Sequence, residues 1–214
     1  LVGLYYCQCV TKGIAVGRHA ESCCYYRRAL VEQDQVDEPY RLRQGWRFAA
    51  PTQASGKHVL DVGAGPSGMS AAYQLRRLGH QVSVMEAGPL LGGMMRFGIP
   101  KYRLPRDVLD GEMQRIVDMG VKVRLNSKVF DLAQTMKDGG YDAAFLAVGA
   151  HIAKRAFIPA KDSSRILDAV AVLRSMDGED KPMLGRRVVV YGGGNTAIDV
   201  ARTAKRLGAT EAII

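Results

Sequence analysis

Apolar residues along the chain become regular from residue 58 onward. Four short apolar runs predict β-strands, at residues 58–62, 81–85, 121–126 and 141–149. The stretches that follow the first run and precede the third carry apolar residues three and four positions apart, the spacing of one helical face. This alternation of strands and helices predicts an α/β fold with a parallel sheet. The unbroken apolar run at 143–148 predicts a strand that is buried on both sheet faces.

The two helices predicted from this spacing cover residues 67–80 and 106–120. Gly79 is expected to cap the first helix, because glycine readily adopts the left-handed conformation that ends helices. The residues expected to face the core are Met69, Ala72, Leu75 and Leu78 in the first helix, and Val108, Leu109, Met113, Ile116 and Val117 in the second.

The same plan starts again at residue 186. Residues 186–214 read as a strand, a Gly-rich turn, a helix and the start of a second strand. The spacing of Gly63, Gly65 and Gly68 recurs as Gly192, Gly194 and Ala197. We therefore expect two βαβ nucleotide-binding units, the second of them truncated. Because the chain starts with Leu and ends in an unfinished strand, we expect a fragment of a longer protein.

Composition and charge exclude several classes of function. The 214 residues are 47% hydrophobic and 24% charged, which is typical of globular domains. Apolar runs are too short to span a bilayer, and the N-terminus lacks the basic region of a signal peptide, so membrane insertion is not expected. The net charge is +9, but the Lys and Arg residues are scattered, and we expect no nucleic-acid partner.

The cysteines are confined to the N-terminal part of the chain, at Cys7, Cys9, Cys23 and Cys24. Their Cys-x-Cys and Cys-Cys steps match neither ferredoxin nor zinc-ribbon spacing, so we predict no metal ligands from them. A chain otherwise free of cysteine favours a reducing, cytoplasmic compartment.

The stretch at residues 58–68, HVLDVGAGPSG, admits two interpretations. VLDVGAG is typical of S-adenosylmethionine-dependent methyltransferases, whereas GAGPSG is typical of the loop that holds the pyrophosphate of FAD or NAD. A methyltransferase would more often have Gly in place of Ser67, but Asp61 is unusual in a flavin-binding strand. Glu86 follows the second strand and suits the ribose hydroxyls of either ligand. The loop alone therefore leaves both interpretations open.

Two longer stretches resemble a known family. They are GGMMRFGIPKYRLPRDVLDGEMQRIVDMGVKVRLN at residues 92–126 and GRRVVVYGGGNTAIDVARTAKRLGA at residues 185–209. Both are similar to the NADPH–FAD oxidoreductase module of the glutamate synthase small (beta) subunit family, a module shared with dihydropyrimidine dehydrogenase. The resemblance covers residues 56–214 and implies tandem Rossmann-like domains of the pyridine nucleotide-disulfide oxidoreductase type. The methyltransferase becomes a remote alternative.

The resemblance also implies a domain organisation. Residues 1–55 would be an N-terminal segment, the remnant of a helical Fe–S-type domain, although the cysteine spacing departs from the family pattern and no cluster ligands are assigned. Residues 56–155 would form the FAD-binding domain and residues 156–185 a connector. Residues 186–214 would start the truncated NAD(P)-binding domain.

Site residues are carried over from the family position by position. Glu86 would bind the adenosine ribose, Arg103 would contact an FAD phosphate, and Val129 would pack near the adenine. In the second unit, Ala197 at the third loop position favours NADP over NAD and leaves NAD possible. The implied FAD contacts are Gly63, Ala64, Gly65, Pro66, Gly68, Glu86, Gly93, Met94, Arg103, Val129 and Gly149, and the implied NAD(P)H contacts are Gly192, Gly193, Gly194, Asn195 and Thr196.

The resemblance implies an enzyme that passes a hydride from NAD(P)H to FAD and then electrons to a larger catalytic or Fe–S subunit. Such chemistry needs no acid–base triad, and we predict none. Surface or core roles are expected for His19, His58, His80 and His151. Asp142 and Asp199 are expected to be strand-start and helix-surface acids, with support of the turn as the alternative for Asp199. The alternative of a different class is a non-catalytic nucleotide-binding fragment.

Overall fold

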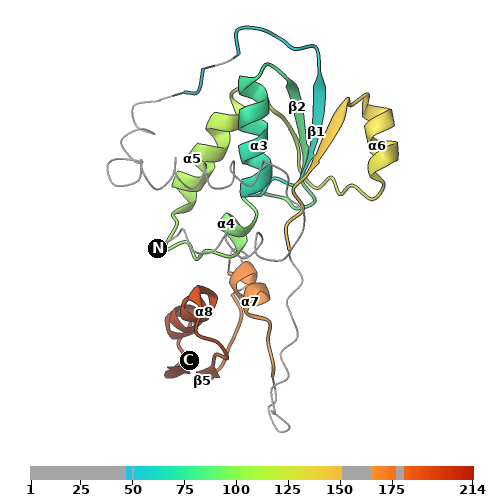
Figure 1. The fold of residues 1–214 in the computed structure, drawn as a ribbon. Helices are drawn as coiled ribbons and strands as arrows, with labels where there is room; N and C mark the ends of the chain where they lie inside the picture. Colours follow the sequence, from blue (N-terminus) through green and yellow to red (C-terminus); the bar gives the residue numbers. More distant parts are fainter. Residues whose placement is uncertain (1–46, 50, 151–164, 177–180) are drawn as a thin grey trace. The chain divides into compact units, whose positions relative to one another are not determined.

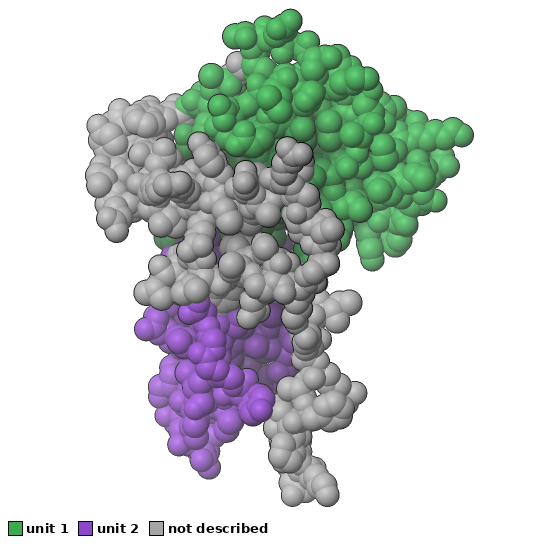
Figure 2. Space-filling model, viewed as in Figure 1, with its two compact units in different colours: residues 1–95, 105–149 green, residues 96–104, 150–214 purple. Residues whose placement is uncertain are grey.

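The computed structural model describes residues 47–49, 51–150, 165–176 and 181–214. The chain divides into two compact units (Figure 2). The first comprises Leu1–Met95 and Pro105–Gly149, and the second comprises Arg96–Leu104 and Ala150–Ile214. All four cysteines, and part of the connector predicted at residues 156–185, lie outside the described residues. The sequence placed residues 96–104 in the FAD-binding domain, whereas the contacts of this segment group it with the second unit.

The first unit is built on a parallel four-stranded sheet in the order β3-β2-β1-β4 (Figure 1). In the central pair, His58 is opposite Gln81 and Val62 is opposite Met85. Because all the strands run in the same direction, their carboxyl ends meet at one edge of the sheet. The strands are β1 (His58–Val62), β2 (Gln81–Met85), β3 (Lys122–Arg124) and β4 (Ala143–Leu146). The α/β class expected from the sequence is confirmed.

Helices connect these strands in the order expected for βαβ units. The long helix α3 begins with a proline in its first turn, where the missing N–H costs nothing, and is followed by Gly79 at φ +84°. Helix α3 contacts β1, β2 and α5. The helices of this part of the chain are α3 (Pro66–Arg77), α4 (Met94–Phe97), α5 (Arg106–Val117) and α6 (Leu132–Gly139).

The core of the first unit lies between the sheet and helices α3 and α5. It contains most of the residues expected from the helical spacing, including Met69, Met113 and Ile116, each at most 2% exposed. Leu78 was predicted wrongly, because its side chain is 69% exposed. Helix α3 ends at Arg77, so the helical period no longer turns Leu78 toward the sheet.

Burial of β4 on both faces was also predicted wrongly. Leu146 and Val148, in β4 and just beyond it, are 59% and 57% exposed. The reason is topological: β4 is an edge strand with β1 as its neighbour in the sheet. Helix α6, which precedes β4, buries none of its own residues.

The second unit contains the strand–turn–helix–strand pattern predicted from residue 186 onward. Strands β5 (Arg187–Val189) and β6 (Glu211–Ile213) pair in parallel, and α8 (Asn195–Arg206) connects them. An additional helix, α7 (Ala169–Ser175), precedes β5. A cluster of buried residues in the core of this unit contains Leu173, Val190, Ala197, Val200 and Ala201.

Candidate nucleotide-binding site

Two glycines of the first loop are required by the packing of the protein itself. Gly63 follows β1 at φ +109°, and a Cβ there would lie 2.4 Å from the carbonyl oxygen of Ala147. A Cβ on Gly68 would lie 1.9 Å from the carbonyl oxygen of Gly63. The first and third glycines of the motif therefore allow the tight turn and the close approach of α3 to that turn.

Gly65, the middle glycine, is different. Its φ of −75° is open to any residue. Among the described residues, the atom nearest to a Cβ built there is the Cα of Gly93, at 3.9 Å. Packing of the protein does not require glycine at this position. The space that a side chain would fill is where a dinucleotide's pyrophosphate approaches the backbone in loops of this kind, so the residues present fit such a ligand.

The start of α3 is electrostatically suited to a phosphate group. Gly65 caps the helix without a side-chain hydrogen bond, and the first turn holds no acidic residue. The first main-chain bond of the helix runs from the Met69 N–H to the Gly65 carbonyl, at 3.0 Å. The preceding N–H groups of Ser67 and Gly68 thus have no partner within the helix. These N–H groups lie at the positive end of the helix dipole, and both features favour the binding of an anion.

Glu86 braces this loop from the end of β2. Its Oε2 accepts a hydrogen bond from the Ala64 N–H, and its Oε1 accepts one from the Gly88 N–H, each at 2.8 Å. A carboxylate oxygen can accept more than one hydrogen bond, so the carboxylate retains capacity for ribose hydroxyls. The structure therefore adds a loop-bracing role that the sequence did not predict.

A second glycine turn packs directly on the first loop. The Gly92 N–H donates to the Ala64 carbonyl at 2.9 Å. Gly93 has φ +49°, and a Cβ there would lie 2.7 Å from the Cα of Gly65. Met94 starts α4 immediately afterwards. The structure thus brings together the predicted residues of the loop, Glu86, Gly93 and Met94 at the carboxyl edge of the sheet, and it adds Gly92.

The other predicted FAD contacts come from later segments of the chain. Val129 is half-buried between β3 and α6, and Gly149 is exposed beyond β4 with φ +70°. Arg103 is part of the second unit, where its Nη1 donates to both carboxylate oxygens of Asp199 at 2.7 and 2.6 Å. The expectation that Asp199 is a helix-surface acid was wrong, since this residue is fully buried. Its position on the inner face of α8 explains the difference.

Asp61 lies beneath the first turn of α3. It is 0% exposed, and neither carboxylate oxygen has a hydrogen-bond partner in the described part of the chain. A Cβ on Gly68 would lie 3.0 Å from its Oδ1, which places the carboxyl group against the start of the helix. Burial raises the pKa of Asp61 to about 8, so the carboxyl group is mainly protonated at neutral pH.

The second Gly-rich loop has the same motif spacing as the first but is less tightly packed. Gly192 has φ +136°, and its added Cβ would lie 3.9 Å from the Ala197 side chain. Among the described residues, no atom lies within 4 Å of a Cβ built on Gly193 or Gly194. Because the turn is less crowded than the first, alanine is accommodated at the third position. Asn195 and Thr196 begin α8 directly after this open loop.

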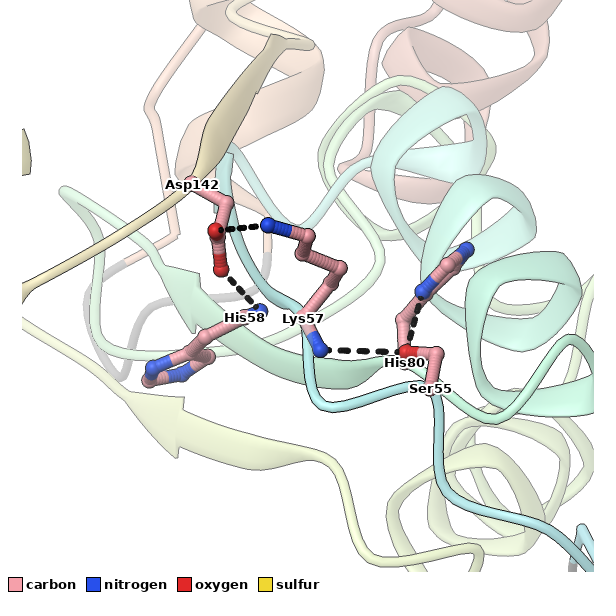
Figure 3. Close-up of polar contacts among 5 residues, drawn as sticks. All are labelled: Ser55, Lys57, His58, His80 and Asp142. Carbon is pink, nitrogen blue, oxygen red and sulfur yellow. Dashed lines mark hydrogen bonds and ion pairs between the residues drawn. The ribbon is translucent and has the colours of Figure 1, made fainter.

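The opposite edge of the first sheet carries a separate polar cluster (Figure 3). Asp142 accepts from the Lys57 ammonium group and from the His58 N–H, both at 2.8 Å. The Lys57 hydrogen bond lowers the pKa of Asp142, whereas burial lowers the pKa of His58. Ser55 and His80 form a neighbouring hydrogen bond of 2.7 Å. These contacts hold the amino ends of β1 and β4 together and are remote from the Gly-rich loop.

Within the described ranges, no helix combines the length and the apolar character needed to cross a bilayer. The same part of the chain contains no group of three or more His, Cys, Asp or Glu residues arranged to hold a metal ion.

A parallel sheet, a Gly-rich turn leading into a helix, and an acid after the second strand define an α/β dinucleotide-binding protein. The model of the pyridine nucleotide-disulphide oxidoreductase family matches residues 57–214, and the chain belongs to this family. The family predicted from the sequence is confirmed. The methyltransferase alternative finds no support in this match.

Relatives are named as NAD(P)H-dependent oxidoreductases. The chain is 45% identical to the NADP(+)-dependent formate dehydrogenase subunit beta of Moorella thermoacetica over 161 residues, covering 73% of this chain and 23% of that protein. It is 35% identical to the glutamate synthase [NADPH] small chain of Escherichia coli (strain K12) over 194 residues, covering 84% and 40%. The chain thus spans less than half the length of either relative.

Solved structures agree with this assignment. A 2-naphthoyl-CoA reductase in complex with 2-naphthoyl-CoA superimposes with a TM-score of 0.63 at 27% sequence identity. The superposition covers 77% of this chain and 24% of that one.

Proposed function

We propose that the chain is a flavoprotein oxidoreductase module that passes a hydride from NAD(P)H to FAD. The observation that carries this proposal is the first loop, where Gly63 and Gly68 are demanded by packing but Gly65 is left open for a ligand. The second open loop, at Gly192–Gly194, supports a second dinucleotide. Family membership and the names of the relatives favour a nicotinamide nucleotide as the reductant.

Each of the two Gly-rich loops would bind one dinucleotide. Residues 63–65 and the start of α3 would hold the FAD pyrophosphate, and Glu86 would accept hydrogen bonds from the adenosine ribose. Gly93 and Met94 would lie along the diphosphate–ribityl part, with Val129 near the adenine and Gly149 at a further close approach. Residues 192–196 would hold the NAD(P)H pyrophosphate. FAD, when bound, supplies the hydride-accepting chemistry.

NADP is the nicotinamide nucleotide that we favour, because both relatives described above are named for NADP(+) or NADPH. These relatives are also named as a subunit beta and a small chain, which supports assembly with a larger partner. We propose that this partner is a catalytic or Fe–S subunit that receives electrons from the flavin. The cytoplasmic location and the four domain boundaries expected from the sequence stay predictions.

Replacing Gly194 with alanine tests the role of the second loop. The backbone of Gly194, at φ −80° and ψ 174°, is open to alanine, and a Cβ there meets no described atom within 4 Å. We therefore expect thermal stability to change by less than about 1 kcal/mol, whereas NADPH affinity falls by at least about tenfold because the methyl group occupies the pyrophosphate's place.

The measurement is titration with NADPH by calorimetry, alongside thermal unfolding. The control is Gly140→Ala, in the turn that ends α6, where a Cβ also meets no described atom within 4 Å but φ is +60°, so alanine is expected to lower thermal stability by about 1 kcal/mol without altering the loop. This control is expected to leave NADPH affinity unchanged. Unaltered NADPH affinity in the Gly194 variant would argue against the proposed loop.

A further inference from the structure

Asp61 is a buried acid in β1, a central strand of the first sheet. In the sheet it is opposite Val84 of β2 and Phe145 of β4, and both of these residues are apolar. Its side chain is 0% exposed, and its carboxylate oxygens have no hydrogen-bond partner among the described residues. Burial of an unpaired polar group costs free energy, and burial of an unpaired charge costs more. Packing alone therefore gives no reason for an acid at this position.

The carboxyl group of Asp61 faces the start of α3. This helix packs on β1 (Figure 1), and a Cβ built on Gly68 would lie 3.0 Å from the Asp61 Oδ1. Gly68 belongs to the first turn of α3, where the N–H groups of Ser67 and Gly68 have no partner within the helix. Asp61 therefore lies against the same helix turn that would bind the FAD pyrophosphate.

The charge on Asp61 decides how strongly this turn attracts an anion. The N-terminus of a helix carries roughly half a positive charge. An ionised carboxylate against the turn would offset that charge and repel the pyrophosphate, and salt screens buried charges only weakly. A protonated carboxyl group does neither. Ionisation of Asp61 and binding of a dinucleotide at this loop therefore oppose each other.

The other titratable groups around β1 and α3 have contacts of their own. Strands β2 and β4 contain no titratable residue. Burial is the cause that raises the pKa of Asp61 to about 8, and no neighbouring charge contributes to the shift. The groups in question are His58 at the other end of β1, which binds Ser83, Glu86 after β2, which binds the Ala64 and Gly88 N–H groups, Tyr73, Arg76 and Arg77 in the second half of α3, and the Glu112–Arg115 pair on α5.

We propose that Asp61 is a positioning residue of the FAD site, which acts through the first turn of α3: the loop binds the FAD pyrophosphate when the Asp61 carboxyl group is neutral, and ionisation of that group weakens binding. This inference rests on the proposed function of the first Gly-rich loop. Below about pH 8 the carboxyl group holds its proton and FAD affinity is highest. Above that pH the binding-competent fraction falls, and the apparent affinity falls with it.

FAD affinity at pH 7 and at about pH 9.5 tests the proposal, with circular dichroism as the check on folding at each pH. ADP-ribose, which has the same pyrophosphate but no flavin, is titrated in parallel to exclude ionisation of the flavin ring as the cause. We expect the unsubstituted chain to lose affinity for both ligands by about tenfold or more at the higher pH. Asp61→Asn is expected to change by less than about threefold, because the amide cannot ionise.

The control variant is Asp142→Asn. Asp142 binds Lys57 at the opposite edge of the sheet, so this variant is expected to keep the pH dependence of the unsubstituted chain. A loss of affinity at high pH that is as large in Asp61→Asn as in the unsubstituted chain would overturn the proposal. Loss of the pH dependence in Asp142→Asn would overturn it as well.

Proton uptake by the unsubstituted chain gives a test that needs no variant. FAD is titrated by calorimetry at about pH 8.5 in two buffers that differ in ionisation enthalpy. We expect each bound FAD to be accompanied by uptake of about half a proton or more, because binding favours protonated Asp61. Binding without proton uptake would refute the role of Asp61 alone, whereas a chain that binds FAD at neither pH would refute the proposed function of the loop.

Discussion

Replacing Asp61 with asparagine is expected to stabilise the first unit, and most strongly at neutral and alkaline pH. The Asp61 carboxyl group is fully buried and has no hydrogen-bond partner among the residues that the structure describes. Burial raises its pKa from 3.8 to about 8, because the charged form loses its hydration. An amide at the same place never has to carry that charge.

The pH dependence follows from proton uptake. Between about pH 4 and pH 8 the folded chain keeps a proton on Asp61 that the unfolded chain has lost, so stability falls as the pH rises. The stability associated with protonated Asp61 is fully present below pH 3.8 and is lost by about pH 8. At 1.36 kcal/mol per pKa unit, the penalty for the wild-type residue is on the order of 5 kcal/mol at high pH.

Urea unfolding between pH 4 and pH 9, followed by circular dichroism, measures this effect. The Asp61→Asn variant is expected to lose most of the downward slope with pH. Asp142→Asn is the control, because the Lys57 hydrogen bond lowers the pKa of Asp142 and its contribution is instead lost as the pH falls through that value. An unchanged slope in the Asp61 variant would show that its carboxyl group is hydrated or paired in solution.

Alanine at Gly68 and alanine at Gly65 are both expected to lower FAD affinity, but for different reasons. The first change disrupts the fold, whereas the second blocks the ligand. At Gly68 the new Cβ would lie 1.9 Å from the Gly63 carbonyl oxygen, so α3 must move away from the loop. We expect a loss of stability on the order of 3 kcal/mol, with FAD affinity lost in consequence.

At Gly65 the described atom nearest to the new Cβ is the Cα of Gly93, at 3.9 Å, and φ is −75°. Alanine there is expected to leave the fold intact or to stabilise it by about 0.4–1 kcal/mol, since it restricts the unfolded chain. FAD affinity is nevertheless expected to fall by about a hundredfold, because the methyl group takes the pyrophosphate's space.

Thermal unfolding and FAD titration of the two variants, made side by side, separate these effects. A Gly65→Ala variant that retains full FAD affinity would remove the main support for the pyrophosphate site. A Gly68→Ala variant as stable as the parent would show that α3 tolerates a shift away from the loop.

The sequence predicted the parts of the fold that depend on local patterns. The strands at 58–62 and 81–85 coincide with β1 and β2 residue for residue, because each is a short, mainly apolar segment bounded by turns. The Gly-rich loop and Glu86 were found because their spacing is set within one βαβ unit. Helix α6 was missed, although Asp131 caps its start and Gly140 ends it in the left-handed conformation. Its eight residues carry only two large apolar side chains, Leu132 and Met136, which are too few to show a helical period.

What depends on distant residues was not predictable. Arg103 and Asp199 are 96 positions apart, and no local pattern indicates their pairing. The exposure of Leu146 follows from the edge position of β4, which is a property of the whole sheet. Asp61 was recognised as unusual for a flavin-binding strand, but its complete burial became apparent only with α3 packed over it.

The most direct test of the proposed function is anaerobic reduction of the flavin. The purified chain is loaded with FAD, freed of excess cofactor and mixed with NADPH while the visible flavin absorbance is followed. We predict that the chain holds FAD, turns yellow, and is bleached as a hydride passes from NADPH to the flavin. A chain that stays colourless, or bound flavin that remains oxidised in excess NADPH, would contradict the proposal, and the second result would favour a non-catalytic nucleotide-binding protein.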